Sequence, residues 1–197
     1  MSARLSGLTI GELTLTPAFS SDVTEYTATT ANATDKITAT PEDEAATVEI
    51  GSQQATIAAD GTATWALGEN EVEITVENGD ASKVYAVTVT KTTDDAPLLD
   101  TLALTRDTEQ TLELSPEFSP SVFSYTATAD ANDWELALQL TSNDAQASVK
   151  VGDGEAVTYT APMAIELVPT GTTAIQITVS APYHTTDAVY TIAVTVE

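Results

Sequence analysis

One stretch of the chain occurs twice: residues 13–29 read LTLTPAFSSDVTEYTAT, and residues 112–128 read LELSPEFSPSVFSYTAT. At this offset of 99 residues, ten of the seventeen positions are identical. Unrelated segments would match at about one position, so the similarity indicates an internal duplication. Because the repeat is longer than the units of solenoid proteins, it predicts two domains of one type in tandem.

The duplication divides the 197 residues into two halves, each long enough to bury a core of its own. We place the first domain at residues 1–92 and the second at residues 97–197. The joint, residues 92–98, reads TTDDAPL. It is short and contains a proline, so we expect a restricted angle between the domains.

Both halves alternate apolar and polar residues with a period of two, as strands with one wet side do. The pattern is clear in residues 71–77 (EVEITVE) and 136–140 (LALQL), and Asn78-Gly79-Asp80 is a strong hairpin signal. Residues 5–10 and 13–15 are expected to form a first strand interrupted near Gly11. No helical period is sustained, and about seven short strands per half predict two tandem immunoglobulin-like antiparallel β-sandwiches.

The aromatic residues divide into expected core residues and candidates for partner contact. Tyr159 and Tyr183 lie near predicted loops, and we take them as candidates for binding a partner, including a glycan. The others occupy matched positions in the two repeats, or lie in or beside expected strands, so we expect them in the cores. These are Tyr26, Tyr125, Phe19, Phe118, Trp65 and Trp134.

Several motifs together resemble a known family. They are the LSGL of residues 5–8, the Leu-x-Pro-x-Phe-x3-Val-x2-Tyr spacing of residues 15–26, the LGEN of residues 67–70 and the KVYAVTV of residues 83–89. The chain resembles the bacterial cadherin-like β-sandwich domains, which belong to the immunoglobulin-like superfold. The second half keeps the core of the motif but has Thr170-Gly171-Thr172 at the turn. The resemblance implies a binding or spacer module of surface or phage virion proteins, without enzyme activity.

Charge excludes some classes of partner. The chain has 30 acidic and 6 basic residues, for a net charge of −24. Such a surface repels nucleic acid and anionic membranes, and it favours a basic partner. The alternative is that the charge only solvates an all-β surface and discourages association between strand edges. With no cysteine in the chain, neither a disulfide nor a thiolate metal site is available.

Neither a metal site nor a catalytic site is expected. Asp94, Asp95 and Asp100 superficially resemble the calcium-binding linker of true cadherins, but the upstream acidic motifs of that family are missing. These three residues are the only metal candidates. Calcium requires about six to eight converging oxygen ligands, which three aspartates do not supply, so we predict neither a metal site nor a cofactor. His184 is the sole histidine and has no nucleophile motif beside it, so no catalytic residue is predicted.

We therefore expect a non-catalytic structural protein that contacts a protein surface, located on a phage virion as a capsid or tail component. An N-terminus without an apolar signal region fits assembly in the bacterial cytoplasm. The alternative is an adhesion or glycan-binding module at a bacterial cell surface or outside the cell. We expect the docking end near Arg4, Leu5, Leu8 and Ile10, unless these leucines simply complete the first sandwich.

Overall fold

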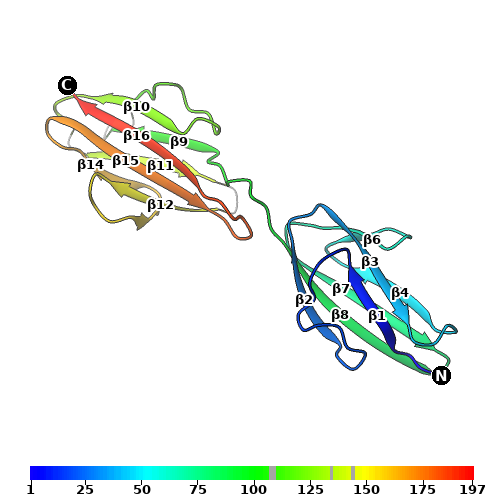
Figure 1. Cartoon of the computed structure of the whole chain (residues 1–197). Helices are drawn as coiled ribbons and strands as arrows, with labels where there is room; N and C mark the ends of the chain where they lie inside the picture. Colours follow the sequence, from blue (N-terminus) through cyan, green and yellow to red (C-terminus); the bar gives the residue numbers. More distant parts are fainter. Residues whose placement is uncertain (107–109, 134, 143–144) are drawn as a thin grey trace. The chain divides into compact units, whose positions relative to one another are not determined.

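The chain folds into two compact units, Met1–Thr93 and Asp94–Glu197, which we call domain 1 and domain 2 (Figure 1). Every regular element of the described residues is a β-strand, eight in each domain. The all-β class predicted from the two-residue period is therefore confirmed. Trp134 lies outside the described residues, so its predicted place in the core stays a prediction. The computed structural model describes residues 1–106, 110–133, 135–142 and 145–197.

Domain 1 consists of two sheets whose apolar sides share one core. The first sheet has the order β1 (Leu5–Ile10), β3 (Thr34–Pro41), β6 (Thr62–Thr64) and β5 (Thr56–Ile57). The second has the order β2 (Glu25–Thr30), β8 (Ala81–Lys91), β7 (Gly68–Asn78) and β4 (Thr47–Ser52). The closing strands β7 and β8 form the predicted hairpin through Gly79 and Asp80, with Gly79 at a φ of +63°.

Domain 2 repeats this plan with one exchange between the sheets. Its first sheet has the order β14 (Met163–Glu166), β11 (Glu135–Thr141) and β9 (Thr101–Thr105). Its second has the order β10 (Ser124–Ala129), β16 (Ala188–Val196), β15 (Gly171–Ser180), β12 (Gln146–Val151) and β13 (Val157–Thr158). The short β13 therefore pairs with β12, whereas its counterpart β5 in domain 1 pairs with β6.

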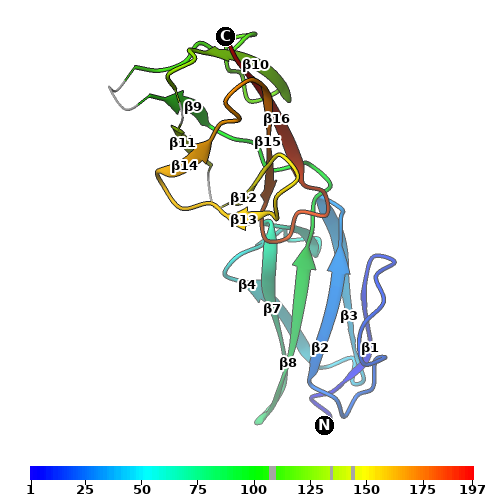
Figure 2. The same ribbon diagram turned by 90° about the vertical axis from the view of Figure 1, so that its left-hand side faces the viewer.

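The sheets are antiparallel, as predicted for immunoglobulin-like sandwiches, except for one parallel pair of strands in each domain. Strand β2 runs parallel to β8, and β10 runs parallel to β16. Between β1 and β2 the chain crosses from one sheet to the other, and β2 then lies at an edge beside the last strand (Figure 2). Alternation of side chains is the same in parallel and antiparallel strands, so the period of two could not reveal the direction.

The first strand is shorter than expected. Strand β1 ends at Ile10, and residues 13–15 belong to the bend that follows, where the Leu13 N–H donates to the Ile10 carbonyl at 2.9 Å. The chain turns at Gly11 with a φ of +50°, and a Cβ there would lie 2.9 Å from a carboxylate oxygen of Asp35. Leu15 is buried all the same, so the apolar pattern predicted its burial correctly although Leu15 lies outside the strand.

The tyrosine of the repeated stretch fastens the bend that leads into β2. Tyr26 is 3% exposed, and its hydroxyl lies 2.7 Å from the Ser20 carbonyl oxygen and 2.8 Å from that of Val23. It also accepts a hydrogen bond from the Ser20 N–H. The ring packs on Phe19, with the two ring centroids 6.0 Å apart. Tyr26 thus satisfies buried main-chain groups with its hydroxyl and fills the core with its ring.

Tyr125 makes the same contacts in domain 2. It is 2% exposed, and its hydroxyl lies 2.7 Å from the carbonyl oxygens of both Ser119 and Val122. Its ring centroid lies 5.9 Å from that of Phe118. The prediction that both tyrosines are core residues is therefore confirmed, as is their equivalence.

A buried carboxylate distinguishes the core of domain 1. Asp35 is 8% exposed and accepts hydrogen bonds from Trp65 Nε1 at 2.9 Å, Thr30 Oγ1 at 3.1 Å and Asn32 Nδ2 at 2.8 Å. Trp65 is 5% exposed, which confirms its predicted place in the core. Domain 2 has Leu136 at the matched position. Asp35 lies two residues before Ile37, which pairs with the first strand of domain 1, and Leu136 lies two residues before Leu138, which pairs with the first strand of domain 2.

Asp35→Leu, which introduces the domain 2 residue, is expected to lower the unfolding free energy of domain 1 by roughly 3 kcal/mol. The apolar side chain would leave buried donors of Trp65 and Thr30 without acceptors, and each unsatisfied group costs about 1–3 kcal/mol. Asp35→Asn keeps one acceptor oxygen and should cost less. Chemical unfolding followed by tryptophan fluorescence would measure both, and equal stability of the Leu variant and the parent would contradict this account.

Tyr190 is expected to make domain 2 less stable at alkaline pH. Burial raises the pKa of its phenol above the ordinary 10.0, so the folded state keeps a proton that the unfolded chain releases. Stability is then full below about pH 10 and falls as the pH rises through the pKa of the folded state. Unfolding free energies measured between neutral pH and about pH 11 should fall more steeply for the parent than for Tyr190→Phe. Equal slopes would contradict the prediction.

Candidate interaction surface

The residues predicted as an N-terminal docking end lie in or beside the first strand of domain 1. Leu5, Leu8 and Ile10 are at most 3% exposed and belong to the core of that domain. They complete the first sandwich, which was the stated alternative, and a partner cannot reach their side chains in the folded domain. Arg4 lies at the surface, where it pairs with Asp22.

The two candidate tyrosines differ in exposure. Tyr159 is half-buried against the core of domain 2, and its hydroxyl accepts a hydrogen bond from the Leu140 N–H at 3.1 Å. Tyr183 is 41% exposed in the loop between β15 and β16. Of these two residues, Tyr183 therefore presents more of its ring to solvent.

The candidate metal ligands Asp94, Asp95 and Asp100 are all exposed. Main-chain carbonyl oxygens of the first two accept hydrogen bonds from Thr186 and His184. Within the described ranges, no three or more His, Cys, Asp or Glu side chains gather in a way that could hold a metal ion. That part of the chain also contains no helix with the length and apolar character needed to cross a membrane.

Acidic side chains gather on the outer side of the sheet β2-β8-β7-β4 in domain 1. Strand β7 alternates strictly: its apolar residues are buried, and the residues between them are exposed or half-buried. Figure 2 shows β7, β8 and β2 side by side, so that the outward residues of the three strands share one surface. The exposed acidic residues of β7 are Glu69, Glu71, Glu73 and Glu77.

Strand register brings two further glutamates onto this surface. Glu73 lies between Gly51 of β4 and Ala86 of β8, and Ala86 in turn pairs with Glu25 of β2. Glu49 adds a carboxylate from β4, two residues from Gly51. We call these six exposed glutamates the acidic face: Glu25, Glu49, Glu69, Glu71, Glu73 and Glu77.

No basic side chain neutralises the acidic face within domain 1, all of whose residues the structure describes. Two lysines belong to the strands of this sheet, but their ammonium groups bind main-chain carbonyls at its ends. Lys83 donates to Ser21, and Lys91 donates to Ala31 and Asn32. The carboxylates therefore act together toward any charged partner.

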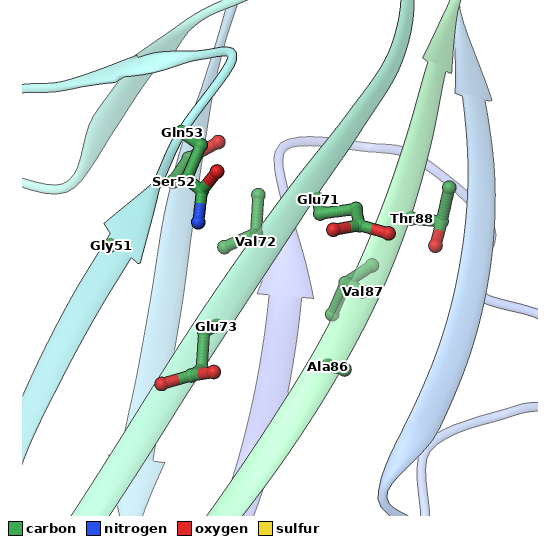
Figure 3. A pocket seen from close by; sticks show the side chains of 9 residues that line it. All are labelled: Gly51, Ser52, Gln53, Glu71, Val72, Glu73, Ala86, Val87 and Thr88. Atoms are coloured by element: carbon green, nitrogen blue, oxygen red, sulfur yellow. The ribbon is translucent and has the colours of Figure 1, made fainter.

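The acidic face contains an open hollow of about 400 Å³ over β4, β7 and β8 (Figure 3). Gly51 and Ala86 flank Glu73 with small residues, and a Cβ added to Gly51 would meet no atom within 4 Å. Glu71 and Gln53 line the same hollow. Carboxylates two residues apart on one strand are about 7 Å apart. Such spacing can hold lysine or arginine side chains by charge-assisted hydrogen bonds.

The matched surface of domain 2 carries no such charge. The row Glu25–Ala86–Glu73–Gly51 of domain 1 corresponds to the row Ser124–Thr191–Gln176–Lys150 of domain 2, with the same strand pairing. All of β10, β16, β15 and β12 are described, and none of these strands contains an acidic residue. Duplication has therefore kept the framework while one face has diverged in charge.

Several solved structures are similar to the chain over most of its length. Drosophila OTK extracellular domains 3–5 are 7% identical over 98% of this chain and 63% of that one, with a TM-score of 0.45. The N-terminal four Ig domains of Dscam1 isoform 4.44 are 15% identical over 94% of this chain and 46% of that one, with a TM-score of 0.47. The chain thus spans about half to two thirds of the length of these proteins. No curated protein matches the chain significantly.

The family comparison covers nearly the whole chain. The model of the family described as "Cadherin-like beta sandwich domain" matches residues 10–92 and, a second time, residues 99–197. The two matches correspond to the two compact units and to the duplicated tyrosine bends. The chain therefore belongs to the cadherin-like β-sandwich family and carries two copies of its domain in tandem.

Proposed function

We propose that this chain is a non-catalytic contact protein that docks through the acidic face of domain 1 onto a basic protein surface. We propose further that this surface belongs to a virion, as a capsid or tail protein. Cadherin-like and immunoglobulin-like domains suggest interaction or adhesion modules, are generally not enzymes and are typical of extracellular or surface proteins. The observation that carries the proposal is the charge difference between the matched sheet faces of the two domains.

Charge complementarity selects the class of partner. Both copies carry many acidic residues, but six exposed glutamates of domain 1 lie on one sheet face, whereas the matched strands of domain 2 contain none. A second copy of the chain is a poor occupant, because a two-fold contact would bring identical carboxylates together. Nucleic acid and anionic lipid are repelled by the net charge of −24. A protein surface rich in lysine and arginine remains.

Association with purified virions at two salt concentrations tests the proposal. We expect the intact chain to sediment with the particles at about 50 mM salt and to be largely released at about 300 mM, because surface charge pairs are screened. Electron microscopy should then show the chain in ordered positions on capsid or tail. Binding that is insensitive to salt would contradict docking through the acidic face.

A glycan array, combined with the virion experiment, distinguishes the virion proposal from the alternative. Retention of the intact chain on a glycan array, together with no association with any particle, would contradict the virion proposal. That result would instead support an adhesion module at a bacterial cell surface. The exposed ring of Tyr183 would then be the first residue to replace, because aromatic rings stack on sugars.

A further inference from the structure

One edge of the sheet β2-β8-β7-β4 in domain 1 is open. Strand β4 pairs with β7 on one side, and within domain 1, all of whose residues the structure describes, no strand pairs with its other side. The matched edge in domain 2 is covered, because β13 pairs with β12 in antiparallel direction, Ser148 with Thr158 and Val149 with Val157. The two copies of the domain therefore present the same edge once open and once paired.

The segment that follows β4 explains why this edge is open. In domain 2, five residues lie between β12 and β13, and the turn begins at Gly152 with a φ of +54°. Domain 1 has Gln53 at the matched position, and only three residues lie between β4 and β5. One of them, Ala55, is buried in the core, and its N–H donates to Ser52 Oγ at 3.0 Å. The chain therefore leaves β4 at once, and β5 pairs with β6 in the other sheet.

The main-chain groups at the open edge belong to Val48 and Ile50. In domain 2 the Tyr159 N–H donates to the Ala147 carbonyl at 2.8 Å, so Ala147 and alternate residues of β12 direct their main chain toward β13. Val48 matches Ala147 at the offset of 99 residues, and Ile50 matches Val149. The N–H and C=O groups of Val48 and Ile50 are thus directed outward, where an extended strand can bind them.

The side chains at this edge are less buried in domain 1 than in domain 2. Val149 is 1% exposed and Ala147 is 8% exposed, whereas their counterparts Ile50 and Val48 are half-buried against the core of domain 1. An added strand would remove more of the apolar surface of Ile50 and Val48 from water, and such burial favours association. The edge therefore offers both hydrogen-bonding groups and apolar surface.

The acidic face selects the charge of the added strand. Glu49 lies on β4 itself, with its side chain exposed on the outer surface of the sheet. Residues directly opposite one another in an antiparallel pair have Cβ atoms about 4.5–5.5 Å apart, so a lysine or arginine opposite Glu49 can form a charge pair. Opposite Gly51, a long basic side chain can extend over the hollow toward Glu73, which pairs with Gly51. A matching strand therefore has basic residues on its outward side and apolar residues on its inward side.

We propose that the open edge of β4 binds an extended segment of the partner protein, in which apolar residues alternate with lysine or arginine, as an antiparallel fifth strand of this four-stranded sheet. The inference deepens the proposed function: it rests on that proposal for the basic charge of the partner, and it adds the conformation of the segment that docks. Its apolar residues cover Val48 and Ile50, and its basic residues lie on the acidic face. The pairing of β13 with β12 supplies the pattern of hydrogen bonds.

Amide hydrogen exchange of the full chain, with and without a peptide, tests the added strand. The probe is a synthetic peptide as long as β4 in which valine and lysine alternate. In the free chain we expect faster exchange at the Ile50 N–H than at the Val149 N–H, because only the latter faces a paired strand. Peptide at about ten times its dissociation constant, in about 50 mM salt, should slow exchange at Val48 and Ile50 about tenfold and leave Val149 unchanged.

Two N-methylated peptides distinguish strand pairing from attraction between charges alone. The valine N–H groups of the docked peptide face β4, because residues in a hydrogen-bonded pair have their side chains on the same side of the sheet. Methylation of the valine nitrogens should weaken binding about tenfold or more, whereas methylation of the lysine nitrogens, at equal charge, should not. Equal affinity of the two methylated peptides, no binding of the unmethylated peptide, or no slowing of exchange at Ile50 would overturn the inference.

Ile50→Pro separates this inference from the proposed function. Proline at an edge position removes an outward N–H and keeps the hydrogen bonds between β4 and β7. The variant should bind both the peptide and purified virions about tenfold more weakly than the parent. If virions bind the variant and the parent equally, with the expected salt dependence, the edge inference fails and the proposed function stands. If the peptide pairs with β4 but virions do not bind the parent, the proposed function fails and the edge site stands. The peptide measurements on the parent chain decide the matter even if the variant does not fold.

Discussion

Tyr26→Ala is expected to lower the unfolding free energy of domain 1 by about 3–5 kcal/mol and to leave that of domain 2 unchanged. The substitution removes a buried ring that packs on Phe19, and it removes the hydroxyl that meets the main chain at Ser20 and Val23. A loss of this size is a large part of the stability of a domain of about 90 residues. Domain 2 has a separate core and should keep its own transition.

Calorimetry of the full chain measures both transitions in one experiment. Tyr125→Ala is the matched variant, because its contacts in domain 2 repeat those of Tyr26, and it should shift only the other transition. Tyr26→Phe keeps the ring and should cost roughly 1–2 kcal/mol for the lost hydrogen bonds. If either alanine variant melts like the parent, the tyrosine does not anchor its sandwich. If both transitions move together, the two domains do not unfold independently.

The sequence predicted most strongly what is local and repeated. The matched setting of Tyr26 and Tyr125 predicted that both lie in a core, because burial in each copy explains why the same aromatic residue stands in the same alternating pattern twice. The alternation along β7 indicated the buried and exposed sides of the strand residue by residue. These features depend on neighbours in the chain, which a sequence displays directly.

Features that depend on pairing between distant segments could not be predicted. The parallel contact of β2 with β8 joins Tyr26 to Val87, and no local pattern specifies it. The exchange of β13 between sheets is of the same kind. Leu5 and Leu8 were candidates for docking because they lie near the chain terminus, but the partner strand β3 and the second sheet bury them.

Only part of the acidic face could be predicted from the sequence. The glutamates of β7 alternate with valine and isoleucine, so their exposure could be inferred. Glu25 and Glu49 join them only through strand register with Ala86 and Thr75, across segments far apart in the chain. The contrast with domain 2 likewise required the register of both sheets. Identity between the repeats draws attention to shared residues, and the function proposed here depends on the positions that differ.

Neutralising the acidic face is expected to weaken docking strongly. One variant replaces four glutamates of β7 by glutamine, which removes four charges and leaves the size of each side chain almost unchanged. The four residues are Glu69, Glu71, Glu73 and Glu77. An exposed charge pair contributes about 0.2–1 kcal/mol, so four should contribute roughly 2 kcal/mol, or about a thirtyfold loss of affinity. Most of these residues have polar or small neighbours on the outer sheet surface, so the fold should be unaffected.

The most direct measurement compares this variant with one of equal net charge. Glutamine or asparagine at Glu113, Glu117, Asp153 and Glu155 removes four exposed charges from domain 2 instead. Binding of the parent and both variants to the same purified virions, at about 50 mM salt, separates location from total charge. The account predicts that the domain 1 variant loses about thirtyfold in affinity, whereas the domain 2 variant binds like the parent. Equal loss in both variants, or no loss in either, would contradict docking through the acidic face.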